Sequence, residues 1–505
     1  MIMKKMTRMM LALLLAAVSV LLCACGAEPE PETVPTEDPN LSVVEFALVT
    51  DNAADLQTLE DYVNLQTLDL RGSNCYEAIE SYISAHPQVK VSYDVQIGAN
   101  RYTPELEALA LNEGEYELQQ LLENIRFLPN LANLELPKTG LSAEQLQQIR
   151  DAYPDLEVRY TVDIFGQEMG METTDLDLSA MDPASVEGLA DVLAMLPELQ
   201  TVNLMTADGT SAFTPVDVKK VMDAAGEATV LYTFELFGKT VSTTDERVEF
   251  KKVDIGNEGI PQIREALDIL PDCTYFLMDT CGVDNEVMAQ LRDDYPDTKV
   301  VWRVFWAFYH DLTDVEMIHC TCKLTDENVE VLKYCTDVKY LDIGHNTDLS
   351  NIDFVKYMPK LEIAIVVDSK IESVEPFAHC PNLQWLEIVN CWKVSDLSPL
   401  ANCKNLKGLN MSCVFEVKDL TPLFELENME RLYLGNNLVP KEMVEAAREA
   451  LPDCWITDFA RSSGNVSRNY AIGWRLDRKD VRAEWYKEIR EIFRYSENFY
   501  NGKFD

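Results

Sequence analysis

Three ionisable residues in the last third of the chain have the types and spacing that acid–base chemistry uses. His319, Asp342 and Glu387 recur at one position of successive short apolar strands, so that one column of a sheet would hold a histidine and two carboxylates. A flat sheet face excludes water poorly, however, and no nucleophile with an orienting partner accompanies them. No serine elbow, phosphate-binding glycine loop or zinc-helix motif occurs. We therefore predict no catalytic residues and no enzymatic activity.

Cysteine is the other reactive residue type, with 13 copies. An odd number of this size in an exported protein would normally indicate disulfides. Cys335, Cys380 and Cys403 nevertheless each stand three residues before an apolar strand, where other repeats have Met or Leu. These are core positions, so we expect mostly free, buried thiols. The run His319-Cys320-Thr321-Cys322 lacks a second ligand pair, and we expect no metal and no cofactor.

The elements that must position these residues are short strands at nearly constant spacing. Each strand has an apolar residue followed by apolar positions three and five residues later. The steps between strand starts are 23, 23, 22, 23 and 23 residues. The starts are Val315, Val338, Leu361, Leu383, Leu406 and Met429. A period this short and regular predicts a solenoid, in which each turn buries its apolar edge only against its neighbours.

The segments between these strands carry a recognisable pattern. Two of them read Val394-Ser395-Asp396-Leu397-Ser398-Pro399-Leu400 and Val417-Lys418-Asp419-Leu420-Thr421-Pro422-Leu423. They resemble the leucine-rich repeats of the internalin family, closely over residues 311–457. The resemblance implies an α/β fold: a curved solenoid of parallel strands with helical or irregular returns. The family has asparagine at the ninth repeat position, as at Asn346 and Asn437, and this chain departs from it at Ser369, Cys391 and Val414.

Upstream, residues 41–310 form divergent units of about 70 residues that resemble leucine-rich repeats less closely. Each unit has a strand of strict apolar alternation, and three of these strands reach a glycine at 98, 166 or 238. A short alternating segment such as Leu176-Asp177-Leu178 follows, so we expect a hairpin-like elaboration in each unit. Leu-Pro pairs end the amphipathic helices. We predict one continuous solenoid from about Leu41 to Cys454.

The N-terminus predicts export. Residues 1–24 read as a signal peptide, with basic residues before a short apolar stretch. Leu22-Cys23-Ala24-Cys25-Gly26 resembles the bacterial lipobox, which implies that Cys25 is lipidated; a soluble protein cut after Ala24 is the alternative. Residues 25–40 interleave proline with acidic residues, as expected of an extended tether. We place the protein at the extracytoplasmic face of the bacterial cell membrane, lipid-anchored and displayed at the cell surface.

The C-terminal residues 458–505 differ in composition from the repeats. From Arg461 they contain ten Lys and Arg against seven Asp and Glu. A helix beginning near Asp477 would align an apolar stripe of Val481, Trp485, Ile489, Ile492 and Phe493. A solenoid needs its open end covered, so we predict a helical cap. A basic docking arm for a partner or the cell wall is the alternative.

Residues between the apolar strand positions should point to the concave sheet face. Several are anchor types enriched at binding sites. The candidate ligand-binding residues are Tyr340, Ile363, Ile365, Trp385, Glu387, Arg431 and Tyr433. We expect this face to bind an extracellular protein or glycan, unless the C-terminal segment or a helix covers it.

The net charge of −43 disfavours nucleic acid as a partner, because so acidic a surface repels phosphate backbones. A self-associating envelope scaffold, with basic tails on neighbouring acidic repeats, is the alternative function. An enzyme is a distant third.

Overall fold

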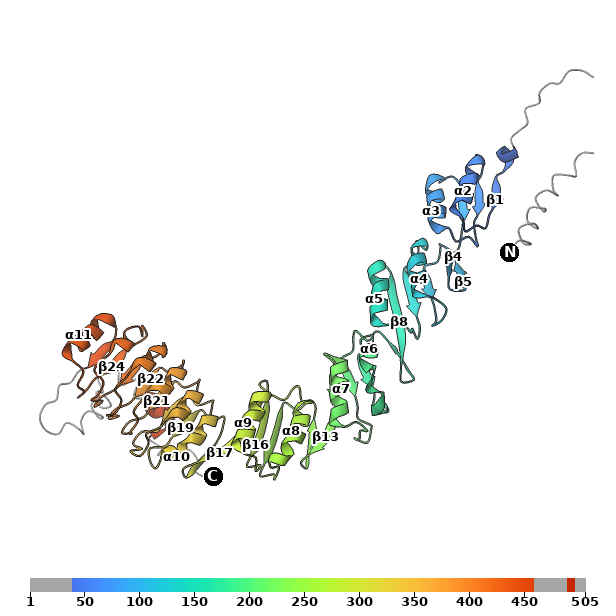
Figure 1. The fold of residues 1–505 in the computed structure, drawn as a ribbon. Coiled ribbons are helices and arrows are strands. Elements are labelled where there is room, and N and C mark those ends of the chain that lie inside the picture. The colour runs from blue at the N-terminus through green and yellow to red at the C-terminus, as the bar shows by residue number, and fades with distance from the viewer. Residues whose placement is uncertain (1–38, 458–487, 496–505) are drawn as a thin grey trace, which may run out of the picture. The chain divides into compact units, whose positions relative to one another are not determined.

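The computed structural model describes residues 39–457 and 488–495 (Figure 1). The chain divides between Asp163 and Ile164 into two compact units. The expected signal peptide, Cys25 and nearly all of the tether lie outside the described residues. So does most of the expected C-terminal cap.

In the first unit, short parallel strands alternate with helices, as the alternating sequence pattern predicts. β1 (Glu45–Ala47), β2 (Thr67–Asp69) and β3 (Lys90–Ser92) form one parallel sheet; β6 (Ala108–Ala110), β7 (Asn133–Leu136) and β8 (Glu157–Ile164) pair in parallel in another. The helices are α2 (Ala53–Gln57), α3 (Tyr76–Ala85), α4 (Leu118–Asn124) and α5 (Ala143–Ala152). Ser142 caps α5 with a reciprocal hydrogen-bonded pair to Gln145, which fixes where this helix begins.

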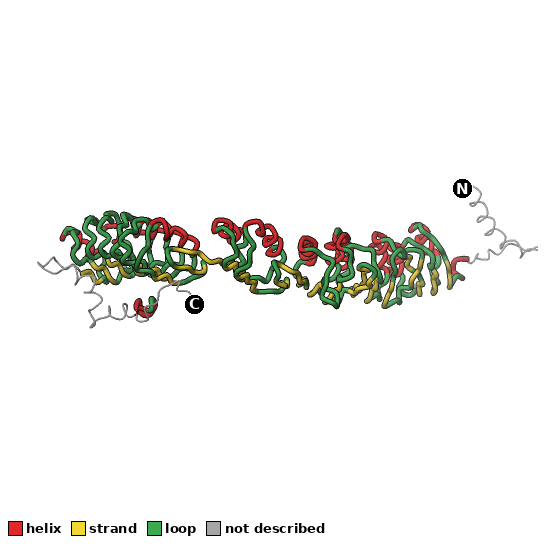
Figure 2. Tube along the Cα trace, turned by 90° about the horizontal axis from the view of Figure 1, so that it is seen from below, coloured by secondary structure: helices red, strands yellow, loops and turns green. Residues whose placement is uncertain are grey.

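The second unit begins with the same alternation. Its upstream strands are β9 (Gln167–Gly170), β10 (Asp175–Asp177), β11 (Thr201–Asn203), β12 (Thr229–Leu231), β15 (Arg247–Lys251), β16 (Tyr275–Asp279) and β17 (Lys299–Trp306). The helices are α6 (Leu189–Leu193), α7 (Pro215–Ala225), α8 (Ile260–Leu267) and α9 (Asn285–Asp294). Leu196-Pro197 and Leu270-Pro271 lie between a helix and the next strand, as predicted. Apart from the short helix at residues 488–492, the helices of each unit lie on one side and the strands on the other (Figure 2).

The predicted hairpins are present. β4 (Val95–Ile97) pairs antiparallel with β5 (Asn100–Tyr102), and β13 (Thr233–Leu236) with β14 (Lys239–Ser242), at the expected Gly98 and Gly238. At Gly166, β8 and β9 are neighbouring strands of one sheet, joined by a hairpin turn at Phe165-Gly166. β17 also pairs antiparallel with β18 (Tyr309–Leu312), where no glycine predicted a turn. The expected role of Leu176-Asp177-Leu178 was wrong, because β10 pairs in parallel with β11 and is no return strand of a hairpin. Its alternation reflects a repeat strand with one buried side chain, Leu176, between two exposed aspartates.

The last repeats form a seven-stranded parallel sheet in chain order, which confirms the strand period. The strands are β19 (Met317–His319), β20 (Tyr340–Asp342), β21 (Ile363–Ile365), β22 (Trp385–Glu387), β23 (Gly408–Asn410), β24 (Arg431–Tyr433) and β25 (Trp455–Thr457). α10 (Asp326–Val329), α11 (Lys441–Ala450) and 3-10 turns return the chain; the turns are Glu330–Tyr334, Asp353–Tyr357, Glu375–His379, Ser398–Asn402 and Thr421–Leu423. This architecture is a leucine-rich repeat solenoid.

Cysteines occupy the core of this solenoid, as their repeat positions predicted. Cys335, Cys380 and Cys403 are buried, and every cysteine that the structure describes is a free thiol. Burial raises the pKa of Cys380 and of Cys403 to about 12, so both stay protonated at neutral pH. They act as small apolar side chains.

Candidate binding face

Two rows of side chains cross the outward side of the sheet β19–β25, which we call the strand face. Parallel register places the first residues of the strands side by side and, two residues later, a second row. The first row is Met317, Tyr340, Ile363, Trp385, Gly408, Arg431 and Trp455. The second row is His319, Asp342, Ile365, Glu387, Asn410, Tyr433 and Thr457. The structure therefore brings all seven candidate ligand-binding residues onto one face.

The expectation that these residues are exposed was wrong for most of them. Tyr340 and Arg431 are half-buried, whereas Trp385 is only 1% exposed. The other buried members of the candidate set are Ile363, Ile365, Glu387 and Tyr433. The structure agrees instead with the alternative expectation that the C-terminal segment covers this face.

Residues 488–495, which we call the C-terminal segment, contact the strand face through their side chains. Figure 2 shows their short helix on the strand side of the repeats. Residues 488–492 are helical, and the side chains of Ile489 and Phe493 are fully buried. These two residues form one apolar cluster with Ile363, Ile365, Val367, Trp385, Val389 and Tyr433. The predicted apolar stripe is confirmed at Ile489 and Phe493, but here it packs on the sheet and not on the open end of the solenoid.

The polar end of the strand face receives the end of the segment. Tyr495 donates its hydroxyl to the Asp342 carboxylate, and its ring lies 5.1 Å from the His319 ring. His319 also meets Phe493 edge-on, with ring centroids 6.0 Å apart. The imidazole Nε2 of His319 is 3.7 Å from Asp342 Oδ2. The histidine and aspartate are thus buried beneath aromatic rings.

Gly408 explains how the largest side chain fits on the strand face. A Cβ at this position would come within 2.0 Å of the Trp385 indole, so the ring lies flat over the neighbouring strand. The Trp385 Nε1 donates to Glu387 Oε1 at 3.0 Å, and the ring meets Tyr433 at 6.2 Å between centroids. The repeat spacing puts Gly408 in the same row as Trp385, but predicted no function for it. A tryptophan and a glycine at the same position of adjacent repeats indicate that the indole ring lies over the glycine.

A hollow of about 180 Å³ remains beside the C-terminal segment. Its lining combines the aromatic Tyr340 with Glu362, Lys407 and Glu488. Burial raises the pKa of Tyr340, so the phenol is protonated at neutral pH and remains a hydrogen-bond donor. The edge of the strand face at Tyr340 is therefore open to solvent beside the C-terminal segment.

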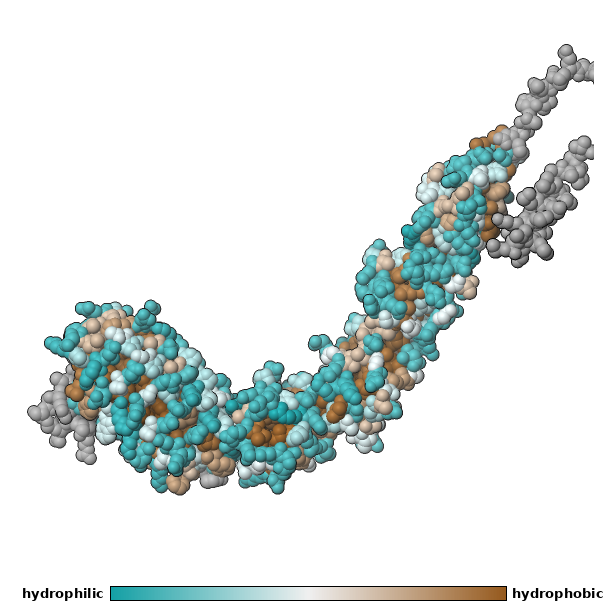
Figure 3. All heavy atoms as spheres, viewed as in Figure 1, coloured by the Kyte–Doolittle hydropathy of each residue, from teal (hydrophilic) through white to brown (hydrophobic). Residues whose placement is uncertain are grey.

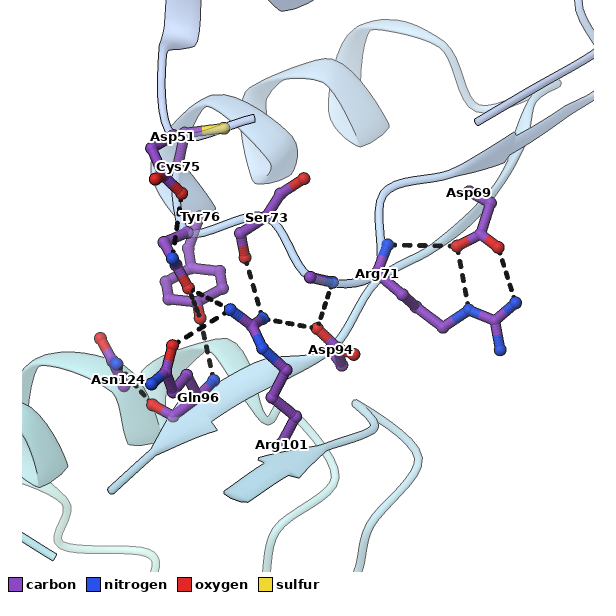
Figure 4. Close-up of polar contacts among 12 residues, drawn as sticks. Asp51, Asp69, Arg71, Ser73, Cys75, Tyr76, Asp94, Gln96, Arg101 and Asn124 are labelled. Atoms are coloured by element: carbon purple, nitrogen blue, oxygen red, sulfur yellow. Dashed lines mark hydrogen bonds and ion pairs between the residues drawn. The ribbon is translucent and has the colours of Figure 1, made fainter. Parts of the chain in front are cut away.

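A larger hollow, of about 680 Å³, lies in the first unit beside α3 and α4. Figure 4 shows the polar network next to it. Arg101 donates to Asp94 Oδ1 at 2.7 Å, to Asn74 Oδ1 at 2.7 Å and to Gln96 Oε1 at 3.1 Å. These contacts tie the β4–β5 hairpin to the loop before α3, so Arg101 has a structural role. Burial raises the pKa of Cys75 on the rim, which makes it a poor nucleophile.

A third hollow, of about 620 Å³, lies on the turns that follow the strands. Trp392 is 51% exposed there, between Glu372 and Glu416. Hydrophilic residues cover most of the face of the molecule seen in Figure 3, and hydrophobic residues appear in separate patches. Exposed Trp392 is therefore a second place where a ligand could stack.

Among residues 39–457 and 488–495, no group of three or more His, Cys, Asp or Glu side chains has metal-binding geometry. Over the same residues no helix is long and apolar enough to cross a membrane.

The fold defines the class of protein as a leucine-rich repeat solenoid, whose outward sheet face carries aromatic, aliphatic and ionisable side chains. No family model and no curated protein matches the chain. Among solved structures, it is similar to internalin InlF of Listeria monocytogenes, with 15% identity, 84% of this chain and 83% of that chain covered, and a TM-score of 0.24.

Two further solved structures are similar at the same level. Internalin C2 of Listeria monocytogenes is 17% identical, covers 55% of this chain and 93% of its own, and has a TM-score of 0.26. A leucine-rich repeat protein of Leptospira interrogans is 15% identical, with 79% and 91% covered and a TM-score of 0.27. Such low scores carry no information on partner or activity.

Proposed function

We propose that this chain is a lipid-anchored protein of the bacterial cell surface, with internalin-like repeats, that binds an extracellular protein through its strand face. The observation that carries this proposal is the chemistry of that face. Ile363, Ile365, Trp385 and Tyr433 point out of the sheet, and such aliphatic and aromatic side chains are typical anchors of protein interfaces. We propose no catalytic activity for His319, Asp342 or Glu387.

The anchoring part of the proposal rests on the lipobox-like sequence at Cys25 and the acidic, proline-rich residues after it. A lipid at Cys25 followed by an extended tether would hold the repeats away from the membrane surface. Replacing Cys25 by Ser should move the protein from the membrane fraction to the medium. Retention of Cys25→Ser in the membrane fraction would contradict lipid anchoring at this residue.

Site-specific photo-crosslinking tests the binding part. A photoreactive phenylalanine analogue at Tyr340 should form a covalent adduct of defined mass with an extracellular protein on intact cells. The same analogue at Tyr357, 47% exposed on a return turn, is the matched control and should give no such adduct. An adduct at 357 but not at 340, or none at either position, would contradict binding at the strand face.

A glycan is the second candidate partner, and the exposed Trp392 with its flanking carboxylates favours it. Sugar rings stack on exposed indoles, while carboxylates accept hydrogen bonds from hydroxyls. Glycan-array binding that disappears in Trp392→Ala would establish this function. Unchanged array binding in Trp392→Ala would remove it.

A further inference from the structure

The C-terminal segment adds nothing to the main core of the solenoid. The inward residues Leu341, Leu386, Leu409 and Leu432 are fully buried in a cluster that contains no residue of the segment. The segment belongs to a second, separate cluster on the other side of the sheet. Each repeat therefore buries its inward apolar side chains without contacts from the segment.

The contact has the form of a peptide helix bound to a receptor surface. Ile489 and Phe493, one helical turn apart, are buried, whereas Glu488, Arg490 and Glu491 are exposed. Helix-in-groove recognition uses anchors with this spacing on one side of the helix. A single apolar stripe thus makes the contact, and the opposite side stays in solvent.

The strand face also gives this contact a direction. Its apolar part, with Trp385 and Ile365, holds Ile489 and Phe493, and its polar part holds the Tyr495 hydroxyl at Asp342. The segment carries no net charge, with Arg490 and Arg494 against Glu488 and Glu491, so its apolar anchors and the Tyr495 hydroxyl make the contact.

We propose that the C-terminal segment is a tethered occupant of the strand face, and that the partner displaces it with an amphipathic helix of the same anchor spacing. This inference rests on the proposed function and specifies its regulation. Covalent tethering raises the local concentration of an occupant to the order of millimolar, so a free helix binds the intact chain weakly. Releasing the segment should make the same face available.

A labelled synthetic peptide of residues 484–498 is the probe, and fluorescence anisotropy is the measurement. The double variant Ile489→Asp/Phe493→Asp should bind the peptide at least about tenfold more tightly than the unmodified protein, because its own segment no longer fills the face. Glu491→Ala, which changes an exposed side of the segment, is the matched control and should behave like the unmodified protein. A peptide with Asp in place of Ile489 and Phe493 should not bind.

Equal peptide affinity in the unmodified protein and the double variant would overturn the proposal, as would failure of the double variant to bind. Far-UV circular dichroism and thermal unfolding verify that the variant is folded. Phe493→Ala, which introduces no charge, should show a smaller gain and tests the proposal if the double variant does not fold. Dimers of the unmodified protein that dissociate when the peptide is added would instead assign the occupant to a second copy.

The two proposals fail separately. Peptide exchange in the double variant without any adduct at position 340 would contradict the proposed extracellular partner and leave the tethered occupant intact. A partner adduct at 340 that forms equally in both proteins, without peptide exchange, would contradict only the tethered occupant. An adduct that increases when the segment is released supports both.

Discussion

A short hydrogen-bonded ladder at the ninth repeat position holds successive turns of the last repeats. Asn346 Nδ2 donates to the carbonyl oxygens of Cys320 and Ile343, both at 2.8 Å, and its Oδ1 accepts from Leu324 N at 2.9 Å. Ser369 and Cys391 replace asparagine but still donate to Val366 O, at 3.2 Å and 2.9 Å. Ser369 and Cys391 therefore preserve part of the hydrogen-bonded ladder although they differ from the family's asparagine.

Asn346→Ala should lower the free energy of unfolding by about 1–3 kcal/mol, because it leaves buried backbone groups without partners. Urea denaturation followed by circular dichroism measures this loss. Asn405→Ala removes a 2.8 Å bond to Pro381 O at the exposed surface and should cost less than about 0.5 kcal/mol. Equal losses in the two variants would contradict a stabilising ladder at Asn346.

Because of its buried thiols, the protein should become less stable to unfolding as the pH rises through the alkaline range. Burial raises the pKa of Cys320 and of Cys391 to about 11, above the value of about 8.5 for an unfolded cysteine. Their contribution is complete below pH 8.5 and is lost as the pH rises toward 11, because only the unfolded chain then ionises. The urea midpoint should therefore fall between pH 8.5 and 10.5. A constant or rising midpoint would contradict protonated core thiols.

At the level of elements, two hairpin turns place phenylalanine in the left-handed backbone region. Phe165 has φ of 51° and Phe237 has φ of 48°, where asparagine or glycine is favoured. Phe237 contacts the core and meets Phe250 edge-on at 6.3 Å, whereas Phe165 is 47% exposed. Packing therefore compensates for the backbone strain only at Phe237.

Phe165→Asn should raise the free energy of unfolding by up to about 1 kcal/mol, because it relieves strain and removes no core contact. The same change at Phe237 should lower it by about 1 kcal/mol, because the lost burial of a partly buried ring outweighs the relief of strain. Thermal unfolding of the two variants measures the difference. Changes of the same sign would contradict this reading of the turns.

Much of the element structure was predictable, because it depends on local spacing. The 22–23 residue period located the last repeat strands, and the repeat position of Cys335 and Cys380 placed these thiols in the core. The burial of Trp385 was not predictable in this way. It depends on Phe493, which lies more than 100 residues later in the chain and contacts the same outward face of the sheet as Trp385.

At the scale of the whole molecule, the described part of the last repeats has two apolar layers. The inward layer of each repeat is continuous with its neighbours, as expected of a solenoid. The outward layer exists only where the C-terminal segment meets the strand face. The repeats therefore supply the fold, and the outward layer supplies a surface that a partner could occupy.

Hydroxyl-radical footprinting of the intact protein, read residue by residue by mass spectrometry, tests the central claim that the chain's own C-terminal segment covers the strand face. Trp385 should resist oxidation while Trp392, 51% exposed in the following turn, is oxidised readily. In Ile489→Asp/Phe493→Asp, oxidation of Trp385 should rise toward that of Trp392. Equal oxidation of both tryptophans in the unmodified protein would contradict the account.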